Sequence, residues 1–210
     1  MSHPRGKRPI PSVPPRGPVD SPELRTFCES LVTTGVLRRG VPVRPPLWAR
    51  AGWCTDNVDR AIADWGGRSE PGWRIIETLP TVLLEAEFHM LWISPDEEAI
   101  DVTPALVRGV PFPFLPDPRL RYEGRQIDNR RLALRDDPMI DQLITMSERR
   151  FAQMNAGGLA EFHGELPLTP EMLADERELI GVEIELRRRY HPVPPPPPRR
   201  KRREGNGRRR

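Results

Sequence analysis

Three residues near the middle of this 210-residue chain, Cys54, His89 and Asp101, have the types and the order needed for nucleophilic chemistry. A cysteine thiolate attacks carbonyl carbon, a histidine can take the thiol proton, and a carboxylate can hold the imidazole in the productive tautomer. The set therefore predicts a Cys-His-Asp catalytic triad, provided that the fold brings the three side chains together.

A helix is predicted to begin at Cys54, because apolar residues recur at helical spacing from there to Trp65 and Gly66-Gly67 then end the pattern. A thiol at a helix N-terminus faces the positive end of the helix dipole and unpaired backbone N–H groups. Both favour its thiolate, and the N–H groups could also receive the oxyanion of a tetrahedral intermediate.

Alternating hydrophobicity predicts strands over residues 73–78, 82–93 and 98–103, with a turn at Ser94-Pro95. If the hairpin turns about Pro95, residues whose numbers sum to about 190 or 191 lie opposite each other, which places His89 across from Asp101 or Val102. Glu85 and Glu87 share the strand face of His89. They are candidates for bonding its ring or for binding a cationic group of a substrate.

The remaining segments complete an α+β prediction. A helix should run from Ser21 to Gly35, prolines predict loops over residues 38–46 and 104–118, and one hairpin is expected within residues 120–134. Two helices follow over residues 138–155 and 170–190, the second capped by Thr169. The five tryptophans lie between Trp48 and Trp92, so the centre of the core is expected there.

The segment from Ala86 to Trp92, followed by Asp101-Val102-Thr103-Pro104, resembles the His-x-x-Trp and Asp-x-Thr strands of transglutaminase-like and papain-like cysteine enzymes. Gly52-Trp53-Cys54 before a helix resembles their nucleophile helix. The same residues are similar to a small uncharacterised bacterial and phage family with a Glu-Ala-Glu-x-His and Asp-Val-Thr-Pro signature. The resemblance spans residues 48–104.

This resemblance implies a papain-like or transglutaminase-like fold, in which a nucleophile helix packs on a small antiparallel sheet and further helices follow. It implies Cys54 as nucleophile, His89 as general base and Asp101 as orienting acid, acting on a peptide or protein amide. No Gln-x5-Cys segment of the papain type precedes Cys54. The residue that supplies the second oxyanion donor is therefore not assigned. Three residues close to Cys54 in the sequence are candidates for that donor or for support of the site: Trp48, Trp53 and Asn57. Glu87 is a further candidate for support of the site.

Charge and proline divide the chain into three parts. Residues 1–20 form an expected disordered arm, residues 21–190 a single domain, and residues 191–210 a polyproline spacer with a basic tail. The net charge is +3, but residues 199–210 hold eight Arg or Lys against one Glu, so the body is acidic. The tail cations are candidates for non-specific nucleic-acid binding: Arg199, Arg200, Lys201, Arg202 and Arg203.

That tail supports an alternative from another class, a non-catalytic scaffold of the same fold that holds nucleic acid. A metal site made of Cys54, His89, Asp101 and either His163 or Cys28 is a further alternative, although no short-spaced ligand pair is present; we expect neither metal nor cofactor. Cys28 lies on an apolar helix face and is expected in the core.

Two cysteines are too few for a disulfide framework, so we expect free thiols in a reducing, cytoplasmic compartment. Neither a secretion signal nor a membrane-spanning segment is recognisable, so no membrane partner is expected. The oligomeric state is open.

Overall fold

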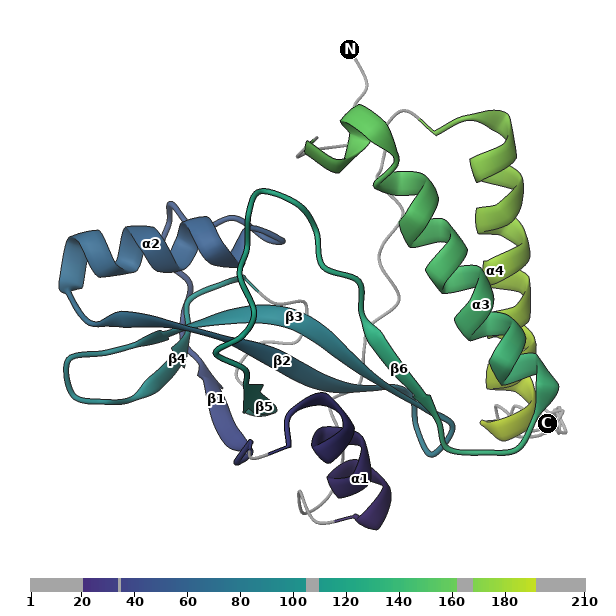
Figure 1. Ribbon diagram of the computed structural model, residues 1–210, viewed down its shortest axis with the longest axis horizontal. Helices are drawn as coiled ribbons and strands as arrows, with labels where there is room; N and C mark the ends of the chain where they lie inside the picture. Colours follow the sequence, from purple (N-terminus) through teal and green to yellow (C-terminus); the bar gives the residue numbers. More distant parts are fainter. Residues whose placement is uncertain (1–20, 34, 105–109, 162–167, 192–210) are drawn as a thin grey trace, which may run out of the picture.

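The structure of the protein is a computed structural model that describes residues 21–33, 35–104, 110–161 and 168–191 (Figure 1). The predicted N-terminal arm and the basic tail lie outside the described residues. In chain order the elements are α1 (Pro22–Leu31), β1 (Arg38–Pro42), α2 (Cys54–Trp65), β2 (Arg68–Leu79), β3 (Leu83–Ile93), β4 (Ala99–Asp101), β5 (Phe112–Pro116), β6 (Arg130–Ala133), α3 (Pro138–Met154), the 3-10 helix η1 (Gly157–Glu161) and α4 (Pro170–Tyr190).

A mixed sheet of six strands, in the order β2-β5-β1-β4-β3-β6, forms the centre of the fold. Because β2 also pairs with β3, five of these strands close into a small barrel, and β6 pairs with β3 outside the ring. The strand pairs are antiparallel except β1 with β4, which are parallel. The α+β prediction is confirmed, and closure of the sheet into a barrel was not foreseen.

Two strands of the barrel come from segments predicted to be loops. β1 lies within residues 38–46 and β5 within residues 104–118, and the two strands pair from Arg38↔Phe114 to Gly40↔Phe112. The loop predictions were wrong there, because the chain tolerates Pro42 at the end of β1 and Pro113 inside the short β5. The hairpin predicted within residues 120–134 was also wrong: of that segment only β6 is a strand, paired with β3.

Glycines let two aromatic rings into the barrel. A Cβ on Gly72 would lie 2.4 Å from the carbonyl oxygen of Leu115 and 2.5 Å from the ring of Phe114, and a Cβ on Gly40 would lie 2.6 Å from the ring of Phe112. A Cβ on Gly72 would collide with the backbone of Leu115, and one on Gly40 would force the ring of Phe112 to move. The rings of Phe112 and Phe114 pack with Leu91 in the core.

The helix α2 covers the outer face of β3, where Val58 and Ala61 pack against Met90, Trp92 and other residues (Figure 1). Because strand residues alternate in direction, Leu91 and His89 point to the opposite face, into the barrel. The predicted bounds of α2 are confirmed, and Gly66 ends it at a positive φ of 75°.

The register of the β3–β4 hairpin differs from the prediction. The pairs are Trp92↔Ile100 and Ile93↔Ala99, so paired residue numbers sum to 192 rather than 190 or 191. If the same register is extended by one residue, Asp101 lies beside Leu91. His89 then lies diagonally from Asp101 on the same inward face. Pairing between β3 and β4 ends at Trp92↔Ile100, so these two strands no longer pair next to His89.

The other helices pack at the edges of the barrel. Ser21 and Thr169 cap α1 and α4 as predicted, each accepting a backbone N–H bond in the first turn. α1 buries Leu24, Phe27 and Cys28 against the barrel, and α3 and α4 form an antiparallel hairpin beside β6 (Figure 1). The α1 prediction holds, except that the helix ends at Leu31.

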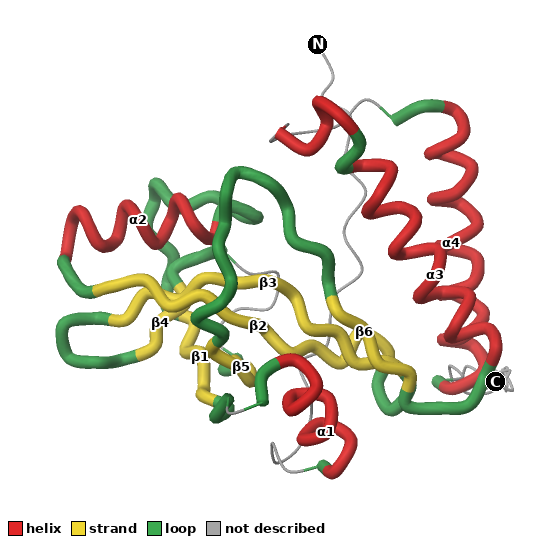
Figure 2. The backbone as a smooth tube through the Cα atoms, in the orientation of Figure 1, coloured by secondary structure: helices red, strands yellow, loops and turns green. Residues whose placement is uncertain are grey.

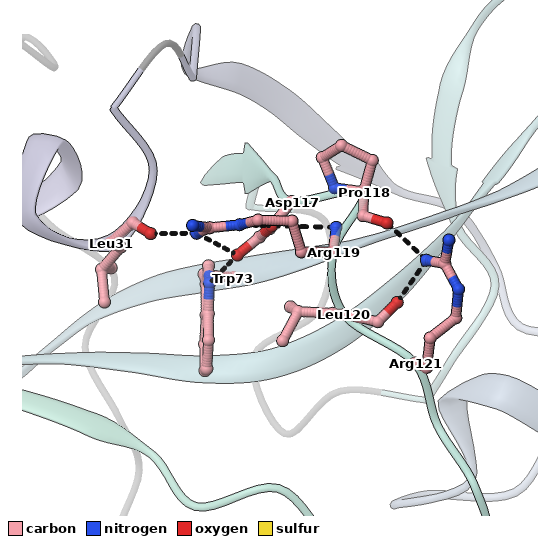
Figure 3. A network of polar contacts seen from close by, with 7 residues as sticks. All are labelled: Leu31, Trp73, Asp117, Pro118, Arg119, Leu120 and Arg121. Carbon is pink, nitrogen blue, oxygen red and sulfur yellow. Dashed lines mark hydrogen bonds and ion pairs between the residues drawn. The ribbon is translucent and has the colours of Figure 1, made fainter.

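A buried carboxylate ties α1 to the barrel. Asp117 accepts from the Trp73 indole at 3.2 Å and pairs with Arg119 at 2.9 Å (Figure 3). The Arg119 guanidinium also donates to the carbonyl of Leu31 at the end of α1. Arg119, more than burial, sets the pKa of Asp117 and holds it below its usual range.

Candidate active site

The structure brings Cys54, His89 and Asp101 together from three elements. His89 Nε2 lies 3.1 Å from Asp101 Oδ1, and the side chain of Cys54 is near enough to the His89 ring to raise its pKa. Asp101 is 1% exposed and His89 is 6% exposed, whereas Cys54 is half-buried at the first position of α2. The histidine therefore lies between a thiol that faces the surface and a carboxylate inside the barrel.

The charges of this group reinforce one another. Burial alone would lower the pKa of His89, but its contacts with Asp101 and Cys54 outweigh burial and raise that pKa to about 10. Burial acts to raise the pKa of Asp101, yet His89, the Thr103 amide and the charge of Arg74 hold it below its usual range. The arrangement favours an imidazolium beside an ionised Asp101 at neutral pH.

Asn57 connects α2 to the segment that follows Asp101. Its Oδ1 accepts from the Arg50 N–H at 2.9 Å, and its Nδ2 donates to the Arg50 carbonyl at 2.7 Å and to Thr103 Oγ1 at 3.3 Å. The Thr103 N–H in turn donates to Asp101 Oδ1 at 2.9 Å. With both amide hydrogens engaged, the buried Asn57 supports the site rather than offering a donor to an oxyanion.

The two candidate tryptophans lie in different places relative to Cys54. Trp53 stands before α2, lines the cavity and lies under the Arg50 guanidinium, 3.7 Å from its ring centre. The ring of Trp48 lies against that of Trp65, the last residue of α2, with ring centres 5.8 Å apart and planes tilted by 39°. No side chain caps α2, so the first-turn N–H groups beside Cys54 have no side-chain acceptor.

A cavity of about 260 Å³ opens on Cys54. Its walls come from the start of α2, from β3 and from the long loop between β5 and β6, which passes α2 in Figure 2. The lining residues include Trp53, Cys54, Asp56, Glu87, Phe88, Tyr122, Gln126 and Asn129. The cavity gives an acyl group a place next to the thiol.

The loop side of this cavity was missed from the sequence, where its segment was read as a weak hairpin. The ring of Tyr122 stacks on Phe88 at 6.0 Å, and burial, followed by the charges of Asp56 and Cys54, raises the pKa of Tyr122. Its proximity to Cys54 follows from a loop crossing that no local pattern signals.

Glu85 and Glu87, both on β3, have different contacts. Glu87 lines the cavity and has no hydrogen bond or ion pair within the described part of the chain. Glu85 instead pairs with Arg131 at 2.9 Å and accepts from the Thr78 hydroxyl. Of the two, Glu87 remains available to a substrate.

Both cysteines are free thiols. Cys28 is buried as expected, and burial, aided by the charge of Glu29, raises its pKa to about 11. Among the residues described, no group of three or more His, Cys, Asp or Glu side chains could hold a metal ion. His163 and the tail cations from Arg199 to Arg203 lie outside the described residues.

Comparison with protein-family models, with curated proteins and with solved structures finds no match to this chain. None of the helices described is long and apolar enough to cross a lipid bilayer.

Proposed function

We propose that this protein is a thiol-dependent hydrolase or acyltransferase that acts on an amide bond of a peptide or protein, with a transglutaminase-like or papain-like Cys-His-Asp triad. The observation that carries the proposal is the position of His89, in contact with both the Cys54 side chain and the Asp101 carboxylate. Nucleophile, base and orienting acid in one line of contacts are what a triad requires.

The residues divide the reaction as follows. The Cys54 thiolate attacks the amide carbonyl carbon, a C–S bond forms, and the carbonyl electrons move to oxygen. The uncapped N–H groups at the start of α2 stabilise that oxyanion. When the oxyanion collapses, the C–N bond breaks and His89 gives its proton to the departing nitrogen, leaving a thioester on Cys54.

The thioester is then released to water or to an amine. His89 takes a proton from the attacking nucleophile, the C–S bond breaks, and Cys54 leaves as thiolate beside the imidazolium. Asp101 keeps the ring aligned through both steps, because its contact is made to Nε2 and leaves Nδ1 for the thiol. Water or an amine enters through the cavity lined by Tyr122 and Glu87.

Alkylation by iodoacetamide tests the proposal, with the two cysteines followed separately by peptide mass spectrometry. Cys54 should react near pH 7 at least about 10-fold faster than a free-thiol peptide. Cys28 is an internal control that should stay slow in the folded protein, since it is buried with a raised pKa. His89→Ala should remove the acceleration at Cys54, and slow, equal rates in both proteins would rule out an activated thiol.

An acylation burst tests the chemistry itself. With p-nitrophenyl acetate, the protein should release about one equivalent of nitrophenol per chain and carry an acetyl group on Cys54. Cys54→Ser should abolish the burst, and Cys28→Ser should keep it. A burst that persists in Cys54→Ser would show that another residue is the nucleophile.

A non-catalytic scaffold that holds nucleic acid is the second candidate, favoured by the eight cations in residues 199–210. Such binding would be sequence-independent and salt-sensitive. Deleting residues 199–210 should then abolish retention of nucleic acid at low salt, and unchanged retention would reject this candidate.

A further inference from the structure

The unsatisfied polar atoms of the structure gather inside the barrel. Within the described residues, four buried side-chain atoms lack a hydrogen-bond partner: Glu70 Oε2, Arg74 Nε, His89 Nε2 and Asp101 Oδ2. The contact of His89 Nε2 with Asp101 is close at 3.1 Å but is not aligned as a hydrogen bond. Buried polar atoms without partners are rare in proteins, so four of them in one barrel need an explanation.

Strand register places all four residues on one face. Gly72 pairs with His89, so Glu70 and Arg74, two positions to either side on β2, point to the same side as His89. Asp101 joins this inward face from β4 through its place beside Leu91. Two members of the group therefore belong to the proposed triad, and two belong to a strand to which sequence reasoning assigned no role.

Arg74 is the cation of this interior group. Its guanidinium lies over the ring of Phe112, 4.7 Å from the ring centre, and the centre of that ring lies 5.8 Å from the centre of the His89 ring in an edge-on arrangement. Arg74 forms no ion pair within the described part of the chain. Glu70 pairs with Arg38 instead, at 3.4 Å, and Glu87 across the strand pair makes no bond to Arg74.

We propose that Arg74 is a positioning residue that holds the Asp101 carboxylate charged and turned toward His89. A charged guanidinium on an aromatic ring and an unpartnered carboxylate oxygen complement each other inside the barrel, directly or through one bound water. The charge of Arg74 also acts to lower the pKa of Asp101, in agreement with this geometry. Arg74 acts through Asp101 and does not touch the substrate; its catalytic importance rests on the proposed function.

Carbon-13 NMR of the Asp101 carboxyl, assigned with Asp101→Asn, measures the effect without relying on catalysis. In Arg74→Gln the Asp101 carboxyl should titrate about one pH unit higher than in the unaltered protein. Arg74→Lys, which keeps the charge, should recover at least half of this shift. Arg68→Gln is the matched control on the same strand, where the exposed Arg68 pairs with Glu97, and should leave the titration unchanged.

A second measurement uses the unaltered protein, in case Arg74→Gln does not fold. The Nε resonance of Arg74 should move with the same midpoint as the Asp101 carboxyl, since coupled charges respond to each other. The proposal is overturned if the Arg74 signal does not change as Asp101 titrates. It is also overturned if the midpoint of the Asp101 titration in Arg74→Gln lies within about 0.2 pH units of that in the unaltered protein. Slow alkylation of Cys54 with a shifted Asp101 titration would instead reject the enzyme and leave the Arg74 to Asp101 coupling intact.

Discussion

Asn57 on α2 and Thr103 after β4 lie 46 positions apart, and the side-chain amide of Asn57 donates to the Thr103 hydroxyl at 3.3 Å. The same Thr103 donates its backbone N–H to Asp101. This link joins the helix that presents Cys54 to the strand that presents Asp101, at the place where β3 and β4 no longer pair. Asn57 therefore links the helix of Cys54 to the segment of Asp101 through Thr103.

Replacing Asn57 with Ala should destabilise the protein by about 2–3 kcal/mol, because the N–H and carbonyl of Arg50 lose their buried partners. Urea unfolding measures this loss. Alkylation of Cys54 should slow as well, since the first turn of α2 loses its attachment to Thr103. Asp59→Asn, an exposed change on the same helix, is the control and should alter stability by less than about 0.5 kcal/mol. If Asn57→Ala loses no more stability than Asp59→Asn, the link through Asn57 does not stabilise the protein.

Replacing Asp101 with Asn should destabilise the protein by about 3 kcal/mol, because it leaves the buried, charged His89 without its counter-charge. The alkylation rate of Cys54 should fall by about 10²-fold as the imidazole loses its orientation. Asp64→Asn removes a carboxylate from an exposed pair with Arg60 and should cost less than about 1 kcal/mol. Equal losses in the two variants would refute a special role for Asp101.

The stability contributed by His89 should depend on pH with a defined sign. Its pKa is raised from 6.5 to about 10 on folding, so the contribution is complete below 6.5 and is lost as the pH rises toward 10. The pKa of Asp101 is lowered, so its contribution exists above 3.8 and is lost on acidification through the lower folded value. The difference in unfolding free energy between the unaltered protein and His89→Gln should therefore be largest between pH 3.8 and pH 6.5, and it should shrink from pH 6.5 to pH 10. Urea unfolding across that range checks it, and a difference that grows with pH would mean that His89 is neutral in the folded state.

Two glycine-to-alanine changes should have opposite effects. Gly72→Ala should destabilise the protein by about 3 kcal/mol or more, because its Cβ meets the Leu115 carbonyl at 2.4 Å and the Phe114 ring at 2.5 Å. Gly181→Ala on α4 meets nothing within 4 Å and should stabilise the protein by about 0.5–1 kcal/mol through helix propensity. Thermal unfolding of the pair measures both, and a tolerated Gly72→Ala would show that the barrel can widen around Phe114.

The elements that sequence reasoning located correctly are those whose signals are local. Ser21 and Thr169 cap their helices with the hydroxyl bonds that their types predict, and the bounds of α2 follow from apolar spacing and Gly66. The alternation around His89 likewise predicted β3. A helix turn or a strand face depends on neighbours a few residues away, so its pattern can be recognised in the amino-acid sequence.

The segments that were read wrongly depend on distant partners. β1 and β5 are proline-containing strands that exist because Arg38 pairs with Phe114 and because Gly40 and Gly72 leave room for two aromatic rings. The predicted hairpin register differs from the observed one by one or two in the sum of paired residue numbers, because the geometry of the turn between Ile93 and Ala99 also sets the register.

The sequence by itself determined that a cysteine opens a helix, that a histidine and an aspartate follow on neighbouring strands, and that the charge of the ends differs from that of the body. Only the tertiary structure decided that the three side chains meet, that Asn57 and Thr103 hold them together, and that Arg74 shares the barrel with Asp101. The reason is physical: the identity of a side chain and its local conformation are encoded nearby, whereas contacts across a closed barrel arise when all five strands pair at once.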